Sequence, residues 1–107
     1  MAKESEKTMQ ELQFLEQNLQ NILLQKQAFE MELNETNSAI EELSGSNEEV
    51  YKIIGQLMIK TDKEKIKEEL SGKEKILNLR IKTLEKQENT VSERIEKLRT
   101  EIMCSMK

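Results

Sequence analysis

The chain has 107 residues, of which 36% are hydrophobic and 36% are charged, and its formal net charge at pH 7 is −4. This balance provides too little apolar material for a thick globular core. Abundant Glu, Lys, Leu and Gln without any proline is typical of long helices and coiled coils. We therefore expect one domain over residues 1–107, with its core along narrow seams between helices.

Catalytic and metal chemistry have little support in this composition. The chain has no histidine, the side chain used most often for general acid–base catalysis, and its single cysteine is Cys104. Without an imidazole beside it, Cys104 forms no nucleophilic dyad, and clustered Cys and His ligands for zinc are missing. The sequence predicts a non-enzyme with no catalytic residue, no metal site and no cofactor.

The distribution of charge and of apolar runs bears on location and partners. Residues 1–44 hold three lysines against nine glutamates, whereas the cations of residues 60–107 alternate with nearly as many acids. That mixture, with few aromatic residues for stacking, disfavours nucleic acid as a partner. No apolar run is long enough to span a membrane, and a lone cysteine suits a reducing compartment. We expect a cytoplasmic protein without a membrane partner.

A first helix is predicted over about residues 5–44. Apolar side chains recur there in steps of three and four, which is the pattern of a coiled-coil seam. The seam positions are Leu12, Leu15, Leu19, Ile22, Lys26, Phe29, Leu33, Thr36, Ile40 and Leu43. The polar residues Lys26 and Thr36 either fix the register of the helices or are tolerated defects near water. Gly45 follows the seam, where a left-handed helix cap is expected.

Residues 50–60 are rich in β-branched residues, carry Gly55 at their centre and predict a β-hairpin. Gly55 supplies the positive φ that the first position of a type II′ turn needs. A turn at Gly55 and Gln56 makes both faces apolar and leaves both strands as edges. Its register is Ile54 with Leu57, Ile53 with Met58, Lys52 with Ile59 and Tyr51 with Lys60.

A lone two-stranded hairpin is marginally stable in water, and unpaired strand edges invite further pairing. No other stretch of this sequence has the pattern of a strand. We therefore expect other chains to complete the sheet. The alternative is that the hairpin packs onto the helices of its own chain.

A second helix is predicted over about residues 62–106. Its seam positions are Leu70, Glu74, Leu77, Ile81, Leu84, Glu88, Val91, Ile95, Leu98 and Ile102. Ser71 and Gly72 interrupt this arm, and we favour a continuous helix over a restart at Ser71 because the phase of the seam carries through. Two such arms with a short connection must fold back as an antiparallel pair.

Both ends of the chain hold apolar residues that two helices do not need for their seam. Phe14 lies off the seam beside Leu12 and Leu15, and Met103 and Met106 flank Ile102. Flexible methionine suits a surface that adapts to several partners. The alternative is that these residues belong to frayed helix ends.

The hairpin motif Val50-Tyr51-Lys52-x-x-Gly55-x-Leu57-x-x-Lys60-Thr61-Asp62-Lys63, placed between two helical arms, resembles the β-class subunit of prefoldin. Residues 31–36, 41–43, 68–70 and 79–88 extend this resemblance over about residues 9–102. It implies a mainly α fold: two long helices that form an antiparallel coiled coil, joined by one β-hairpin that completes a barrel with other subunits.

The resemblance also implies a function. Prefoldin is a cytosolic, ATP-independent holdase of two α-class and four β-class chains. It binds unfolded clients such as actin and tubulin at the coiled-coil tips and delivers them to a group II chaperonin. The implied partners are therefore α-class subunits, other β-class subunits, unfolded clients and that chaperonin. A structural coiled-coil tether, in which the hairpin is only a turn, is the alternative function.

The resemblance assigns two groups of residues in this chain. The assembly hairpin comprises Val50, Tyr51, Ile53, Ile54, Gly55, Leu57, Met58 and Ile59. The client-contact tip comprises Leu12, Phe14, Leu15, Leu98, Ile102, Met103 and Met106.

Overall fold

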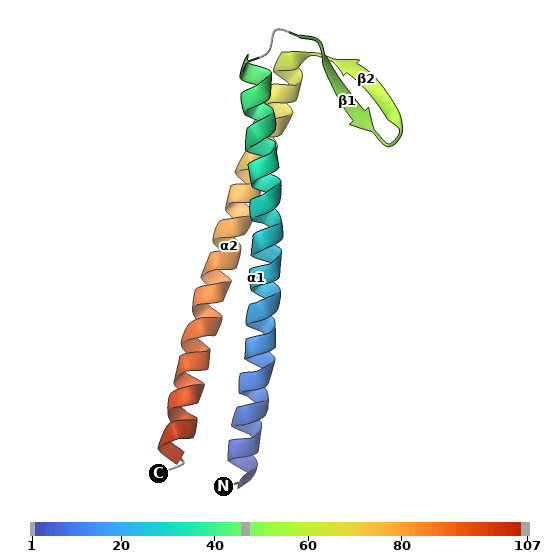
Figure 1. The fold of residues 1–107 in the computed structure, drawn as a ribbon. Helices are drawn as coiled ribbons and strands as arrows, with labels where there is room; N and C mark the ends of the chain where they lie inside the picture. Colours follow the sequence, from blue (N-terminus) through green and yellow to red (C-terminus); the bar gives the residue numbers. More distant parts are fainter. Residues whose placement is uncertain (1, 46–47, 106–107) are drawn as a thin grey trace. The chain divides into compact units, whose positions relative to one another are not determined.

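The computed structural model describes residues 2–45 and 48–105, which form a helix, two strands and a second helix in that order (Figure 1). Helix α1 spans Ala2–Gly45 and helix α2 spans Lys63–Ser105. Between them, strand β1 (Val50–Ile54) and strand β2 (Leu57–Thr61) form an antiparallel sheet. This confirms the predicted fold of two long helices joined by one β-hairpin.

The chain divides into two compact units. The terminal unit holds the residues up to Ala28 together with those from Ile81 onward, and the hairpin unit holds Phe29–Arg80. Each unit therefore contains part of α1 and part of α2, and the two strands lie in the hairpin unit.

In the terminal unit, ion pairs join α1 to α2 and show that the helices run antiparallel. Glu11 pairs with Arg94 near the end of α2, at 3.1 Å between Oε1 and Nη2. Lys26, later in α1, pairs with Glu88 and Glu85, earlier in α2. The core between these helices is made of aliphatic side chains, namely the buried residues Ile22, Ile81, Leu84, Ile95 and Leu98.

The burial of individual residues confirms the predicted seams. None of the ten predicted seam positions on α1, and none of the ten on α2, is exposed. Large apolar residues that lie off the seams, such as Leu24 and Met31, remain more than 60% exposed. The steps of three and four therefore identified the inward face of each helix.

Three of the polar seam residues, Lys26, Thr36 and Glu88, have partners on the facing helix or on their own helix. The Nζ of Lys26 donates to Oε2 of Glu88 at 3.2 Å, so a polar interruption in α1 meets a polar interruption in α2. Because their side chains are only 22% and 28% exposed, this pairing favours the register-fixing interpretation. In the hairpin unit, the buried hydroxyl of Thr36 donates to the carbonyl of Glu32 at 2.8 Å, so it needs no partner outside α1.

The strands pair in the predicted register, with Ile54 opposite Leu57 and Tyr51 opposite Lys60. Gly55 has a φ of 60°, and no other residue within 2–45 and 48–105 has a positive φ. Gln56 therefore has a negative φ, and a positive followed by a negative φ is the combination found in a type II′ turn.

The ends of the helices agree only in part with the sequence analysis. Oδ1 of Asp62 accepts a hydrogen bond from the backbone N–H of Glu64 at 3.3 Å, and its carbonyl accepts one from Ile66 at 3.1 Å. Asp62 is thus the N-cap of α2, which continues without a break through Gly72. The prediction of a left-handed cap at Gly45 is wrong, because α1 includes Gly45 as its last residue without a positive φ.

Replacing Gly72 by alanine should stabilise the chain. Gly72 lies in an exposed stretch of α2, and an added Cβ meets no atom within 4 Å. Because a glycine inside a helix costs about 1 kcal/mol relative to alanine, Gly72→Ala should raise the melting temperature by roughly 4–8 °C.

Thermal unfolding followed by circular dichroism measures this effect, and Gly55→Ala is the matched control. It also has open space around its Cβ position, but its positive φ makes alanine unfavourable by about 1–2 kcal/mol. We expect the two variants to shift the melting temperature in opposite directions. A lower melting temperature for Gly72→Ala would contradict a regular helix at that position.

Candidate functional site

The hairpin presents apolar side chains on both of its faces. Ile54 and Leu57 lie on one face, and Ile53 and Met58 lie on the other, because they form neighbouring pairs in the strand register. The predicted assembly residues form the hairpin surface, of which Val50 is half-buried and Tyr51, Ile53, Ile54, Gly55, Leu57, Met58 and Ile59 are exposed.

The exposure of this surface is large for apolar residues. Ile53, Leu57 and Met58 are 70%, 66% and 67% exposed. Exposed apolar patches are typical of interaction sites. In the described part of the chain each strand pairs only with the other, so both outer edges offer backbone hydrogen bonds as well. The hairpin therefore has both the apolar side chains and the free backbone groups that sheet extension by another chain requires.

Polar contacts surround the start of the hairpin without covering its apolar side chains. Oε2 of Glu49 accepts a hydrogen bond from the Tyr51 hydroxyl at 2.8 Å, and Oε1 lies 3.1 Å from Nζ of Lys60. Nζ of Lys52 lies 3.0 Å from Oε2 of Glu69 and links β1 to α2. These exposed contacts orient the hairpin and contribute little to stability.

These contacts change the acidity of two groups. The hydrogen bond from Tyr51, with a smaller effect from Lys60, lowers the pKa of Glu49. The same carboxylate raises the pKa of Tyr51 above its ordinary value of 10. Glu49 was not among the residues predicted from the sequence. Because Glu49 lies two residues before Tyr51, and Tyr51 pairs with Lys60, its nearness to both side chains could have been inferred from the predicted register.

The terminal unit contains the predicted client-contact residues, and they differ widely in exposure. Phe14 is 68% exposed and Met103 is 66% exposed, whereas Leu98 is 1% exposed. Leu12, Leu15 and Ile102 are half-buried. Met106 lies outside the residues that the structure describes.

Leu98 is a packing residue in this structure, which differs from its assignment as a client contact. Its seam position directs the side chain into the helix pair, where it is the most deeply buried residue named in the core. Met9, which the sequence analysis missed, is 50% exposed and precedes Phe14 by little more than one helical turn. The exposed apolar residues Met9, Phe14 and Met103 are called the tip surface below.

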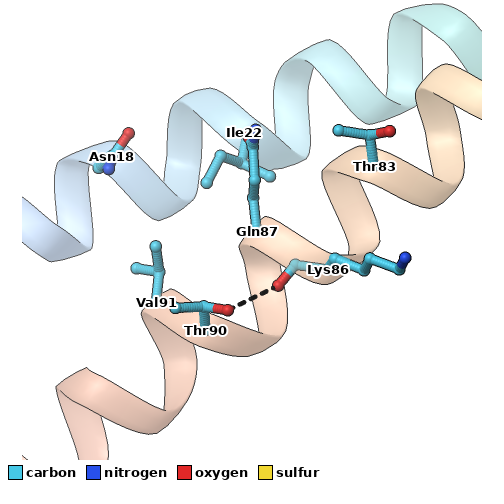
Figure 2. Close-up of a pocket in the computed structure, with 7 residues that line it drawn as sticks. All are labelled: Asn18, Ile22, Thr83, Lys86, Gln87, Thr90 and Val91. Atoms are coloured by element: carbon cyan, nitrogen blue, oxygen red, sulfur yellow. Dashed lines mark hydrogen bonds between the residues drawn. The ribbon is translucent and has the colours of Figure 1, made fainter.

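A groove of about 350 Å³ lies between α1 and α2 in the terminal unit (Figure 2). Figure 2 shows Val91 and Gln87 of α2 directed toward α1, and the Thr90 hydroxyl donates to the carbonyl of Lys86 at 3.0 Å. The lining residues are Asn18, Ile22, Thr83, Lys86, Gln87, Thr90 and Val91. Since Lys86 is the one titratable side chain among them, the groove brings together no pair of groups for acid–base chemistry.

The part of the chain that the structure describes has neither a candidate metal site nor a membrane-spanning helix. Within residues 2–45 and 48–105, no three Asp, Glu, His or Cys side chains are grouped in a way that could hold a metal ion. Neither helix, over the same residues, combines the length and apolar character needed to cross a membrane.

Comparison with known proteins gives consistent relatives. A family model described as a prefoldin subunit matches residues 5–107. A prefoldin subunit beta from Sulfurisphaera tokodaii is 40% identical over 93 residues, which cover 85% of this chain and 74% of the relative. The prefoldin subunit beta of Thermococcus onnurineus is 36% identical over 99 residues, covering 91% of this chain and 85% of the relative.

Solved structures with similar folds agree with these relatives. The crystal structure of the prefoldin beta subunit from Thermococcus strain KS-1 superposes with a TM-score of 0.88 at 32% identity, covering 95% of this chain and 91% of the other. The beta2 subunit from the same strain gives a TM-score of 0.74 at 21% identity, covering 81% and 95% of the two chains. The second similarity shows a shared fold alone.

The titration of Tyr51 tests the contact with Glu49. Tyr51 is the only tyrosine and the chain has no tryptophan, so tyrosinate absorbance reports this one hydroxyl. Because the folded pKa is raised, the hydrogen bond stabilises the folded chain below pH 10 and is lost as the pH rises through the raised pKa.

We expect Tyr51 to titrate above pH 10 in the wild-type chain and closer to 10 in Glu49→Gln. Glu69→Gln is the control, because Glu69 contacts Lys52 and should leave the titration of Tyr51 unchanged. Identical titration curves for wild type and Glu49→Gln would show that the contact is absent in solution.

Proposed function

Because this chain belongs to the prefoldin family, as a subunit of its β class, we propose that it is part of an ATP-independent hexameric holdase that keeps unfolded polypeptides from aggregating. In this proposal the chain joins α-class subunits and other β-class subunits, binds clients such as actin and tubulin, and passes them to a group II chaperonin. It acts in the cytoplasm as a non-enzyme, without a cofactor and without nucleic acid or membrane as a partner.

The observation that carries the proposal is the exposed hairpin surface. Apolar side chains on both faces of this two-stranded sheet are 66–70% exposed. A hairpin that buries so little apolar surface is only marginally stable in water by itself. Hairpins from other subunits supply the missing strands, pair with both edges and enclose one of the two apolar faces. The result is a closed barrel, which removes the strand edges altogether.

The tip surface is the proposed client contact. Met9, Phe14 and Met103 are exposed apolar side chains of the terminal unit, and two of the three are flexible methionines. Such side chains adapt to clients of different shape. The half-buried residues Leu12, Leu15 and Ile102 support them, Leu98 holds the helices together beneath, and Met106 remains a predicted contact.

The role of the hairpin in assembly can be tested with Ile54→Lys combined with Leu57→Lys. Both residues lie on one face of the sheet, and two buried lysines should cost the assembly about 3 kcal/mol or more in lost apolar burial alone. We expect native mass spectrometry of the mixture with an α-class partner to show loss of the hexamer.

The matched control for that variant is Ile76→Lys combined with Leu79→Lys, which changes two exposed apolar residues of α2. It should leave the hexamer intact. An unchanged oligomeric state in the hairpin variant would instead favour the alternative function, a coiled-coil tether in which the hairpin is only a turn.

The role of the tip surface can be tested with Met9→Gln, Phe14→Gln and Met103→Gln in one chain. These side chains are 50–68% exposed, so the fold should survive their replacement. We expect the hexamer to form normally but to hold an unfolded client at least about tenfold less tightly, measured as suppression of client aggregation without ATP.

The control for the tip is Met31→Gln, because Met31 is 62% exposed but belongs to the hairpin unit. It should protect the client as well as the wild-type chain does. Full protection by the triple tip variant would move the client contact away from the tip surface.

A further inference from the structure

In the stretch of α1 between residues 10 and 28, every charged residue forms an ion pair with α2. Between residues 10 and 28 the sequence holds three charged residues, Glu11, Glu16 and Lys26. Glu11 pairs with Arg94 and Glu16 with Arg99, each at 3.1 Å, and Lys26 pairs with Glu88 at 3.2 Å. In a chain that is 36% charged, this stretch therefore directs every charge toward the neighbouring helix.

The opposite side of the same stretch carries neutral amides. At about 100° per residue, six exposed Gln and Asn residues lie within about 60° of the direction of Leu24. We call them the amide strip, which comprises Gln10, Gln13, Gln17, Gln20, Asn21 and Gln27. Gln20 is at the border of this face, because it also lines a groove with Ser92 and Ile95 of α2. Leu24, 64% exposed, and the exposed Ala28 complete this face without adding charge.

A neutral outer face is unusual for a helix of a coiled coil, since charged residues normally occupy the side opposite the seam. Neutral amides lose their water at a smaller cost than charged groups do. Each glutamine also offers two donors and one carbonyl acceptor, and no amide of the strip has a hydrogen-bond partner among the residues that the structure describes. The strip can therefore bind another neutral hydrogen-bonding surface.

We propose that the amide strip binds a segment of unfolded polypeptide in extended conformation, through hydrogen bonds between its side-chain amides and the backbone of that segment. This inference rests on the proposed holdase function and extends its client contact along α1. An unfolded chain exposes backbone N–H and C=O groups that lack partners, and these groups are the same whatever its sequence. The strip thus contributes contacts that do not depend on the side chains of the client.

The position and length of the strip suit this occupant. Gln10 and Gln17 lie within one turn of Phe14, so the strip is continuous with the tip surface. From Gln10 to Gln27 the helix rises about 26 Å, which corresponds to about eight residues of extended chain. A client segment can therefore place an apolar side chain against Phe14 while its backbone follows the strip.

The test replaces the three amides of the strip nearest Phe14, with Gln10→Glu, Gln13→Glu and Gln17→Glu in one chain. Glutamate has nearly the shape and helix propensity of glutamine, but it cannot donate a hydrogen bond when ionised. The control has Asn78→Asp, Gln87→Glu and Asn89→Asp, which make the same change at three exposed positions of α2.

Both variants are assembled into the hexamer with the α-class partner, and binding is measured by fluorescence anisotropy. The probe is a dye-labelled, cysteine-free polypeptide of near-zero net charge that stays unfolded. We expect the strip variant to bind it about tenfold more weakly, at low and at high salt, and the control to bind it as the wild-type hexamer does.

Several results would overturn the inference. An unchanged affinity shows that the amides do not contact the client, and a loss that disappears at high salt shows only long-range repulsion. A changed native mass shows that the strip joins subunits instead. These three results leave the proposed function in place, whereas a wild-type hexamer that fails to bind the probe overturns the holdase function together with the strip.

Discussion

A two-stranded sheet cannot cover its own apolar faces, and this constraint explains more of the molecule than any other. The hairpin pairs its strands fully and makes a tight turn at Gly55, so its local structure is complete. Its side chains nevertheless remain exposed on both faces, Ile53 at 70% and Met58 at 67%. The helices solve the same problem within one chain, because a narrow seam needs only one facing helix. The apolar residues of the seam are therefore buried or half-buried within the chain, whereas those of the hairpin are mostly exposed.

The helices separate charge from apolar surface in a consistent way. Charged side chains of α1 that lie near α2 form pairs with it, as Glu11 does with Arg94. On the seam itself, Lys26 of α1 meets the opposite charge of Glu88 on α2. Half-buried opposite charges that face each other specify one alignment of two helices, although they add less stability than apolar residues would. The stretch of α1 that faces solvent between residues 10 and 28 is left neutral.

Periodic features could be predicted from the sequence, and features set by a single side chain could not. The spacing of apolar residues in steps of three and four identified the inward face of both helices, and the Gly55-Gln56 turn predicted the register of the strands. Both predictions rely on regular backbone geometry, which is the period of the helix and the length of the turn. The resemblance to prefoldin assigned Leu98 to the client-contact tip, whereas its seam position places it in the core, where it is buried. The contacts of Glu49 depend on rotamers that no periodic pattern encodes, and the exposure of Met9 followed only from the structure.

The two outer edges of the hairpin also affect what happens to copies of this chain that lack partners. Among the residues that the structure describes, strands β1 and β2 each bond only to the other, so the opposite side of each is open. A copy produced in excess of its partners keeps those edges and the residues around Leu57 uncovered, and identical edges can then pair with one another. An excess of this chain over its partners therefore favours association between copies through the hairpin.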